Sequence, residues 1–91
     1  MPFVRRLPSL TQLRHLVALT EHCHFGRAAA ACFVTQSSLS ASIKELEALL
    51  GEVLIERTRR KVMPTPLGLA VVDRAQKVLT GAEEIVDLVA A

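Results

Sequence analysis

The sequence has few aromatic residues: three Phe, no Trp and no Tyr among 91 residues. Proteins that bind single-stranded nucleic acids stack the bases on aromatic rings, so this scarcity disfavours that class. The longest apolar run, residues 28–34, has seven residues, whereas a membrane-spanning helix needs roughly 20. The first residues include Arg5 and Arg6 and contain no apolar signal region. We therefore expect a cytoplasmic chain without a membrane partner.

Cysteine is scarce as well, and two cysteines are too few for the disulfide scaffold of a small secreted domain. Cys23 and Cys32 are therefore expected to be reduced thiols. His22, Cys23 and His24 suggest a metal site, but three consecutive side chains diverge on any regular element, and no second cluster supplies the remaining tetrahedral ligands. We expect packing or helix-end polarity to explain them, with no metal and no cofactor. A thiol or metal sensor stays as an alternative.

The chain is also short, and a domain of 91 residues has little room for a deep catalytic cavity. No nucleophile, base and oxyanion donor can be grouped by spacing, so we do not expect an enzyme. Charge is divided unevenly: residues 1–61 hold nine Lys and Arg against five Asp and Glu, whereas residues 62–91 hold two against four. The two parts should therefore have different roles.

Two helices are predicted before residue 33. Ser9 and Gln12 have the spacing of a capping box, so a helix should start at Leu10, and its apolar periodicity continues to about His22. The Ala-rich segment 26–32 has high helix propensity and predicts a second, short helix.

The segment from Gln36 to Leu50 has the clearest helical pattern. Thr35 is a good N-cap in front of it, and Gly51 stands where a left-handed terminating residue belongs. One apolar stripe runs along it: Leu39, Ile43, Leu46 and Leu50. The opposite face holds Ser37, Ala41, Lys44 and Ala48, with Ser40 beside them. A helix that enters the major groove needs such small or donor-rich side chains, whereas an ordinary solvated face carries more Glu and Lys.

After this helix the pattern changes to that of a two-stranded ribbon and a long helix. Residues 53–57 and 62–63 are β-prone, and the segment between them is charged. Four cations lie within five residues there: Arg57, Arg59, Arg60 and Lys61. Such a cluster is either a solvated loop or a set of phosphate contacts. Thr65 and Pro66 then have the properties of an N-cap and a first helical residue, and Gly68 looks like a mild penalty inside the helix.

Three apolar rows recur every seven residues in this last helix, more than one coiled-coil seam needs. Their members, Val71, Val72, Ala75, Val78, Leu79, Ala82, Ile85, Val86 and Val89, are the predicted dimerisation residues. One row could pack on the first three helices while the others meet a second copy, because a lone monomer would expose too much apolar surface. The pattern also stops without a capping residue, which suggests a fragment of a longer protein, and Gly81 could kink the helix.

Many residues stand in the order of a known family. They are Phe25 with Arg27-Ala28-Ala29, Val34 to Ser40, Ile43 with Leu46-Glu47, Leu50-Gly51, Leu54 with Glu56-Arg57, Arg60, and Thr65 with Gly68. Residues 10–68 thereby resemble the N-terminal DNA-binding domain of LysR-type transcriptional regulators. Residues 43–68 are most similar to the peroxide-responsive, OxyR-like members, whose redox chemistry belongs to a different domain. Cys23 and Cys32 are therefore not expected to be a sensor pair.

The resemblance implies a mainly α fold with a small two-stranded β wing. Residues 1–65 would form a winged helix-turn-helix and residues 66–91 a linker helix for dimerisation, with a ligand-sensing domain beyond this chain. The implied function is sequence-specific binding of double-stranded DNA by a bacterial transcription regulator. A homodimer, or a tetramer of the intact protein, would bind a pseudo-palindromic operator through the recognition helix in the major groove and the basic wing on phosphates or in the minor groove.

Twelve side chains are expected to contact DNA. Ser37, Ser40, Ala41 and Lys44 would face the major groove, and Gln36 would meet a base or a phosphate. The remaining seven would meet the backbone or the minor groove: Arg27, Thr35, Ser38, Arg57, Arg59, Arg60 and Lys61. Three of these have a structural alternative, because Thr35 could cap the helix, Arg27 could neutralise Glu47, and Arg57 could make an ion pair.

The family often has Pro at position 37 and Arg followed by Gln at positions 41 and 42, where this chain has Ser37, Ala41 and Ser42. Two long side chains that could reach base edges are therefore missing. Sequence preference should depend on Gln36, Ser40, Lys44, a contact of the Ala41 methyl with thymine, and DNA deformability. A dimerisation or protein-interaction module with an incidental basic wing is a second reading of the same pattern.

Overall fold

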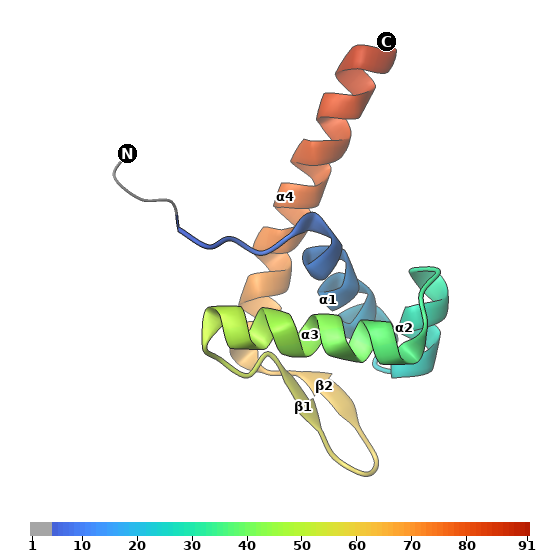
Figure 1. Cartoon of the computed structure of the whole chain (residues 1–91), viewed down its shortest axis with the longest axis vertical. Coiled ribbons are helices and arrows are strands. Elements are labelled where there is room, and N and C mark those ends of the chain that lie inside the picture. Colours follow the sequence, from blue (N-terminus) through green and yellow to red (C-terminus); the bar gives the residue numbers. More distant parts are fainter. Residues whose placement is uncertain (1–4) are drawn as a thin grey trace.

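The computed structural model describes residues 5–91. The elements follow in the order α1 (Leu10–His22), α2 (Phe25–Ala31), α3 (Gln36–Leu50), β1 (Ile55–Arg57), β2 (Val62–Pro64) and α4 (Pro66–Ala90). In Figure 1, α3 lies across the other helices, the β ribbon projects below it, and α4 extends far beyond the rest of the molecule. This is the predicted arrangement of a winged helix-turn-helix followed by a long helix.

The helix ends explain the polar residues between α1 and α2. Ser9 and Gln12 form the predicted capping box, with Ser9 N donating to Gln12 Oε1 and Gln12 N donating to Ser9 Oγ. Cys23 ends α1 in the left-handed conformation, and the His24 ring accepts a hydrogen bond from Arg27 N as the N-cap of α2. Helix-end polarity therefore accounts for the Cys23-His24 pair.

The core forms where α1, α2, α3 and the start of α4 meet. Its fully buried large side chains are Leu16, Leu19, Leu39, Ile43, Leu46 and Leu54. The stripe predicted on α3 is buried at its first three positions, but Leu50 is 40% exposed. The fully buried part of the stripe therefore ends one helical turn before Leu50, which lines an apolar groove between α1 and α4.

The wing is a ribbon in which Ile55 pairs with Pro64 and Arg57 with Val62. At its base Gly68 of α4 is buried, and a Cβ at this position would lie 2.1 Å from Leu54 O. The view of Gly68 as a mild penalty was wrong, since only a residue without a side chain lets the first turn of α4 approach the strand this closely.

Helix α4 runs without interruption through Gly81. Its first half completes the core, because Val72 and Ala75 are buried. These two predicted dimerisation residues thus serve the chain's own interior. Its second half carries five exposed apolar side chains: Val78, Ile85, Val86, Leu88 and Val89 are each between 48% and 82% exposed. Among residues 5–91, no helix is long and apolar enough to cross a membrane.

Candidate nucleic-acid interface

The outer face of α3 is a shallow, open hollow free of acidic side chains. Its lining consists of Gln36, Ser37, Ser40, Ala41 and Lys44. These are five of the residues expected from the sequence to contact DNA, and the helix brings them together on one surface because they repeat at its period. Small side chains next to one cation leave room for the edge of another polar molecule.

The first turn of α3 is held by its N-cap. Thr35 Oγ1 accepts a hydrogen bond from Ser38 N at 3.0 Å and donates one to Ser38 Oγ at 2.9 Å. The capping role expected of Thr35 is therefore confirmed. Both residues and Gln36 are exposed, so their outward atoms remain accessible at the positive end of the helix dipole.

Ser42 does not belong to this face. It is partly buried and its Oγ lies 2.8 Å from His15 Nδ1, which joins α3 to α1. Burial, together with the nearby Arg14 cation, lowers the pKa of His15 and favours the neutral ring. The expectation that two groove-facing side chains are missing at positions 41 and 42 needs correction, because only Ala41 faces outward.

The wing tip presents three cations to solvent. Arg59, Arg60 and Lys61 are exposed in the turn between the strands. Thr58 shapes this turn: its Oγ1 accepts hydrogen bonds from Arg60 N and Lys61 N, and its own amide donates to Lys61 O at 2.8 Å. The predicted basic tip is therefore an ordered turn.

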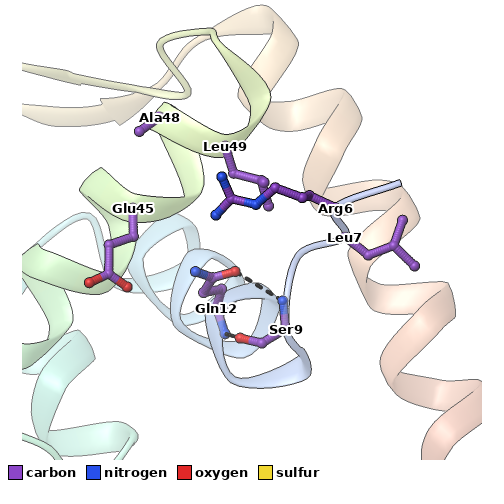
Figure 2. Close-up of a pocket in the computed structure, with 7 residues that line it drawn as sticks. All are labelled: Arg6, Leu7, Ser9, Gln12, Glu45, Ala48 and Leu49. Carbon is purple, nitrogen blue, oxygen red and sulfur yellow. Dashed lines mark hydrogen bonds between the residues drawn. The ribbon is translucent and has the colours of Figure 1, made fainter. Parts of the chain in front are cut away.

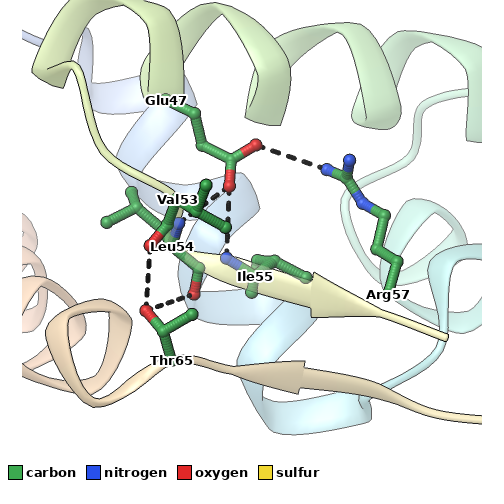
Figure 3. Close-up of polar contacts among 6 residues, drawn as sticks. All are labelled: Glu47, Val53, Leu54, Ile55, Arg57 and Thr65. Carbon is green, nitrogen blue, oxygen red and sulfur yellow. Dashed lines mark hydrogen bonds and ion pairs between the residues drawn. The ribbon is translucent and has the colours of Figure 1, made fainter.

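Arg57 points toward the body of the protein and not toward the tip. Its Nη2 lies 3.5 Å from Glu47 Oε1, and its guanidinium carbon lies 5.3 Å from the centroid of the Phe25 ring. Figure 3 shows this ion pair crossing from β1 to α3. The alternative of a structural ion pair for Arg57 is confirmed, and it makes Arg57 a poor candidate for DNA contact. Arg27 is exposed on α2, and Arg57 takes the place at Glu47 that Arg27 could have filled.

A second hollow lies between the N-terminal segment and α3. Figure 2 shows Arg6 and Leu7 on one side, Glu45, Ala48 and Leu49 on the other, and the Ser9-Gln12 capping box below. Ala48, expected on the outer face of α3, lines this hollow instead. This hollow contains both an acid, Glu45, and a cation, Arg6, whereas the hollow on the outer face of α3 contains no acid.

The cysteine alternative finds no support in the geometry. Cys23 and Cys32 are free thiols, and burial raises the pKa of Cys32, which disfavours its reactive thiolate. Within residues 5–91 no group of three or more His, Cys, Asp or Glu side chains could hold a metal ion.

Residues 10–69 match the family described as bacterial regulatory helix-turn-helix protein, lysR family. The chain belongs to the LysR family. Among curated LysR-type relatives, the transcriptional regulator EstR of Acinetobacter baylyi is 55% identical over 82 residues, which cover 90% of this chain and 27% of that protein. The transcriptional dual regulator OxyR of Escherichia coli is 51% identical over 71 residues, or 78% of this chain and 23% of OxyR.

The chain thus spans about a quarter of the length of these relatives. OxyR is among these relatives, in agreement with the resemblance of residues 43–68 to OxyR-like members, and EstR is at least as similar to the chain. They are named as transcriptional regulators and not as enzymes, in line with the expectation from the sequence. Among solved structures, a complex of the BenM DNA-binding domain with catB site 1 DNA superposes with a TM-score of 0.84 at 36% identity, covering 89% of this chain and 90% of that one. The fold is therefore that of a LysR-type winged helix-turn-helix.

Proposed function

We propose that this chain binds double-stranded DNA in a sequence-specific manner as the DNA-binding part of a bacterial LysR-type transcriptional regulator. The observation that carries the proposal is the acid-free outer face of α3, lined by Gln36, Ser37, Ser40, Ala41 and Lys44. The similarity to a domain solved on its DNA supports the same function. Such a protein would act in the bacterial cytoplasm, where the chromosome lies.

The roles of the side chains follow from their positions. Gln36, Ser40 and Lys44 would donate to base edges or phosphates in the major groove, and Ala41 would contact a thymine methyl group. Arg27, Ser38 and the outer side of Thr35 would meet phosphates, while Arg59, Arg60 and Lys61 would meet phosphates or the minor groove. We leave Arg57 out of this set because Glu47 and Phe25 hold it.

The same reasoning favours a second copy of the chain as a partner. Residues 1–65 would form the DNA-binding unit and residues 66–91 the linker helix that joins two copies, with Leu88 added to the predicted contacts. The exposed second half of α4 and an apolar groove lined by Leu13, Leu50, Val71 and Val78 support this pairing. Burial stabilises by roughly 25 cal/mol per Å² of apolar surface, so pairing these surfaces is favourable. The intact regulator would be a dimer or a tetramer that reads a two-fold-related site.

DNA binding is tested by fluorescence anisotropy with a duplex selected from a randomised pool, measured at several salt concentrations. Affinity should fall as salt rises, because cations of the protein displace counterions from phosphates. Lys44→Glu should weaken binding at least tenfold. Lys77→Glu is the matched control, because Lys77 undergoes the same charge change on the exposed surface of α4, where it pairs with Asp73. Binding that is independent of salt, or equal for the two variants, would refute the proposal.

Sedimentation of the same samples tests the pairing. We expect a dimer that Ile85→Glu converts to a monomer, because a buried unpaired charge opposes association. If the wild-type chain forms dimers but binds no duplex, the hypothesis of a protein-interaction module replaces the hypothesis of a DNA-binding regulator.

A further inference from the structure

Glu47 is an acidic residue of α3 whose carboxylate contacts the base of the wing. Its side chain is 15% exposed, and it makes three polar contacts with residues 54–57, two at the entry to β1 and one at its end. Its Oε2 accepts hydrogen bonds from Leu54 N at 2.8 Å and Ile55 N at 3.2 Å, while Oε1 pairs with Arg57 at 3.5 Å. Figure 3 shows both carboxylate oxygens directed toward the strand. One side chain therefore ties α3 to both the start and the end of β1.

The other side of the wing base is tied to α4. Thr65 N donates to Leu54 O at 2.9 Å, and Thr65 Oγ1 donates to Val53 O at 3.0 Å. Leu54 thus accepts from the cap of α4 through its carbonyl and donates to Glu47 through its amide (Figure 3). A two-stranded ribbon has little stability or rigidity of its own, so these anchors determine its direction.

We propose that Glu47 is the positioning residue of the wing. Its carboxylate fixes β1 against α3 and so determines where Arg59, Arg60 and Lys61 meet the duplex that α3 contacts. The inference rests on the proposed DNA binding, and it adds a residue that touches no DNA itself.

The sign of the effect separates positioning from simple electrostatics. Replacing Glu47 removes a negative charge and frees the Arg57 cation, and both changes alone would tighten binding to a polyanion. A positioning role predicts weaker binding instead, because the wing cations lose their place on the duplex.

The test uses Glu47→Ala and Glu47→Gln, each in the wild-type chain and in a chain whose tip is neutralised by Arg59→Ala, Arg60→Ala and Lys61→Ala. Glu52→Ala is the matched control, because Glu52 is an exposed acid just beyond α3. Binding is measured with the pool-selected duplex at several salt concentrations and at a temperature where circular dichroism shows each variant folded. If Glu47→Ala does not fold, Glu47→Gln, which keeps an acceptor oxygen, takes its place.

We expect Glu47→Ala to weaken binding at least fivefold and to lower the salt dependence, while Glu52→Ala leaves binding unchanged or slightly tighter. In the tip-neutralised chain, Glu47→Ala should have no further effect. Equal losses in both backgrounds, or an unchanged salt dependence, would overturn the inference.

Hydrogen exchange without DNA separates this inference from the proposed function. The amides of Leu54 and Ile55 should exchange roughly tenfold faster or more in the Glu47 variants, because a charged acceptor is lost. Unchanged exchange there would overturn the positioning role whether or not the chain binds DNA. Faster exchange in a chain that binds no duplex would instead refute the proposed function.

Discussion

Gly68 and Gly81 lie on the same helix, and we predict that alanine has opposite effects at the two positions. In a helix interior Ala is better than Gly by about 1 kcal/mol, so propensity alone favours both substitutions. At Gly81 a Cβ would meet nothing of the chain itself within 4 Å, so helix propensity should determine the effect. At Gly68 the Cβ would lie 2.1 Å from Leu54 O, although real Cβ contacts are essentially never shorter than 3.0 Å.

The clash at Gly68 can be relieved only by moving the backbone of Leu54. Leu54 O is a backbone atom held by Thr65 N, and Leu54 N is held by Glu47, so the strand must move away from both anchors. Overpacking of this kind costs about 3 kcal/mol, which exceeds the propensity gain and leaves a net loss of about 2 kcal/mol. For a domain of this size, we expect the melting temperature to fall by roughly 10 °C for Gly68→Ala and to rise by about 5 °C for Gly81→Ala.

Thermal unfolding followed by circular dichroism measures both variants against the wild type. Protein concentration must be the same in all samples, because the melting temperature of a dimer depends on it. The argument would be refuted if Gly68→Ala melted at or above the temperature of the wild type. Equal shifts for the two variants would show that propensity, and not the approach to Leu54, controls the effect.

Three further predictions concern Phe33 in the turn between α2 and α3, the buried His15, and Thr35 as the N-cap of α3. Phe33 lies in the left-handed region with a φ of 57°, and its side chain is 96% exposed. Because Asn adopts this conformation more readily, Phe33→Asn should raise the free energy of unfolding by roughly 1 kcal/mol. Urea titrations that show a decrease would contradict this. Because the pKa of His15 is lowered in the folded protein, the unfolded chain binds the proton first, and stability should fall as pH drops below about 6.5. Urea titrations between pH 7.5 and pH 5 should show a shallower fall for His15→Gln, and an identical fall would exclude His15 as the cause. Thr35→Ala should cost about 1 kcal/mol whereas Thr35→Ser should cost little, and calorimetry showing equal losses would argue against the cap.

The helices and the wing could be predicted from the sequence because their signals are local. A capping box, an apolar stripe and a terminating glycine act within one or two turns of a helix, and this range is short enough to be seen in the order of residues. The same holds for the outer face of α3, since residues 37, 40, 41 and 44 share a face whenever the segment is helical. The charged turn between two β-prone runs likewise indicated where the cations of the wing tip lie.

Contacts between elements could not be predicted from these local patterns. Ser42 appeared to belong with Ala41, yet it bonds to His15 on α1, and Arg57 appeared to belong with the wing tip, yet it pairs with Glu47 on α3. Leu50 continued the stripe in the sequence, but it lies at the rim of an apolar groove and stays 40% exposed.

Local pattern thus determined which segments become helices or strands and which face of α3 is free of acid. Only the tertiary structure decided that Glu47 anchors the wing and that Gly68 must lack a side chain. The physical reason is distance along the chain: residues 47 and 68 act on Leu54, seven and fourteen positions away, after packing of the core has placed α3 and α4 on either side of it.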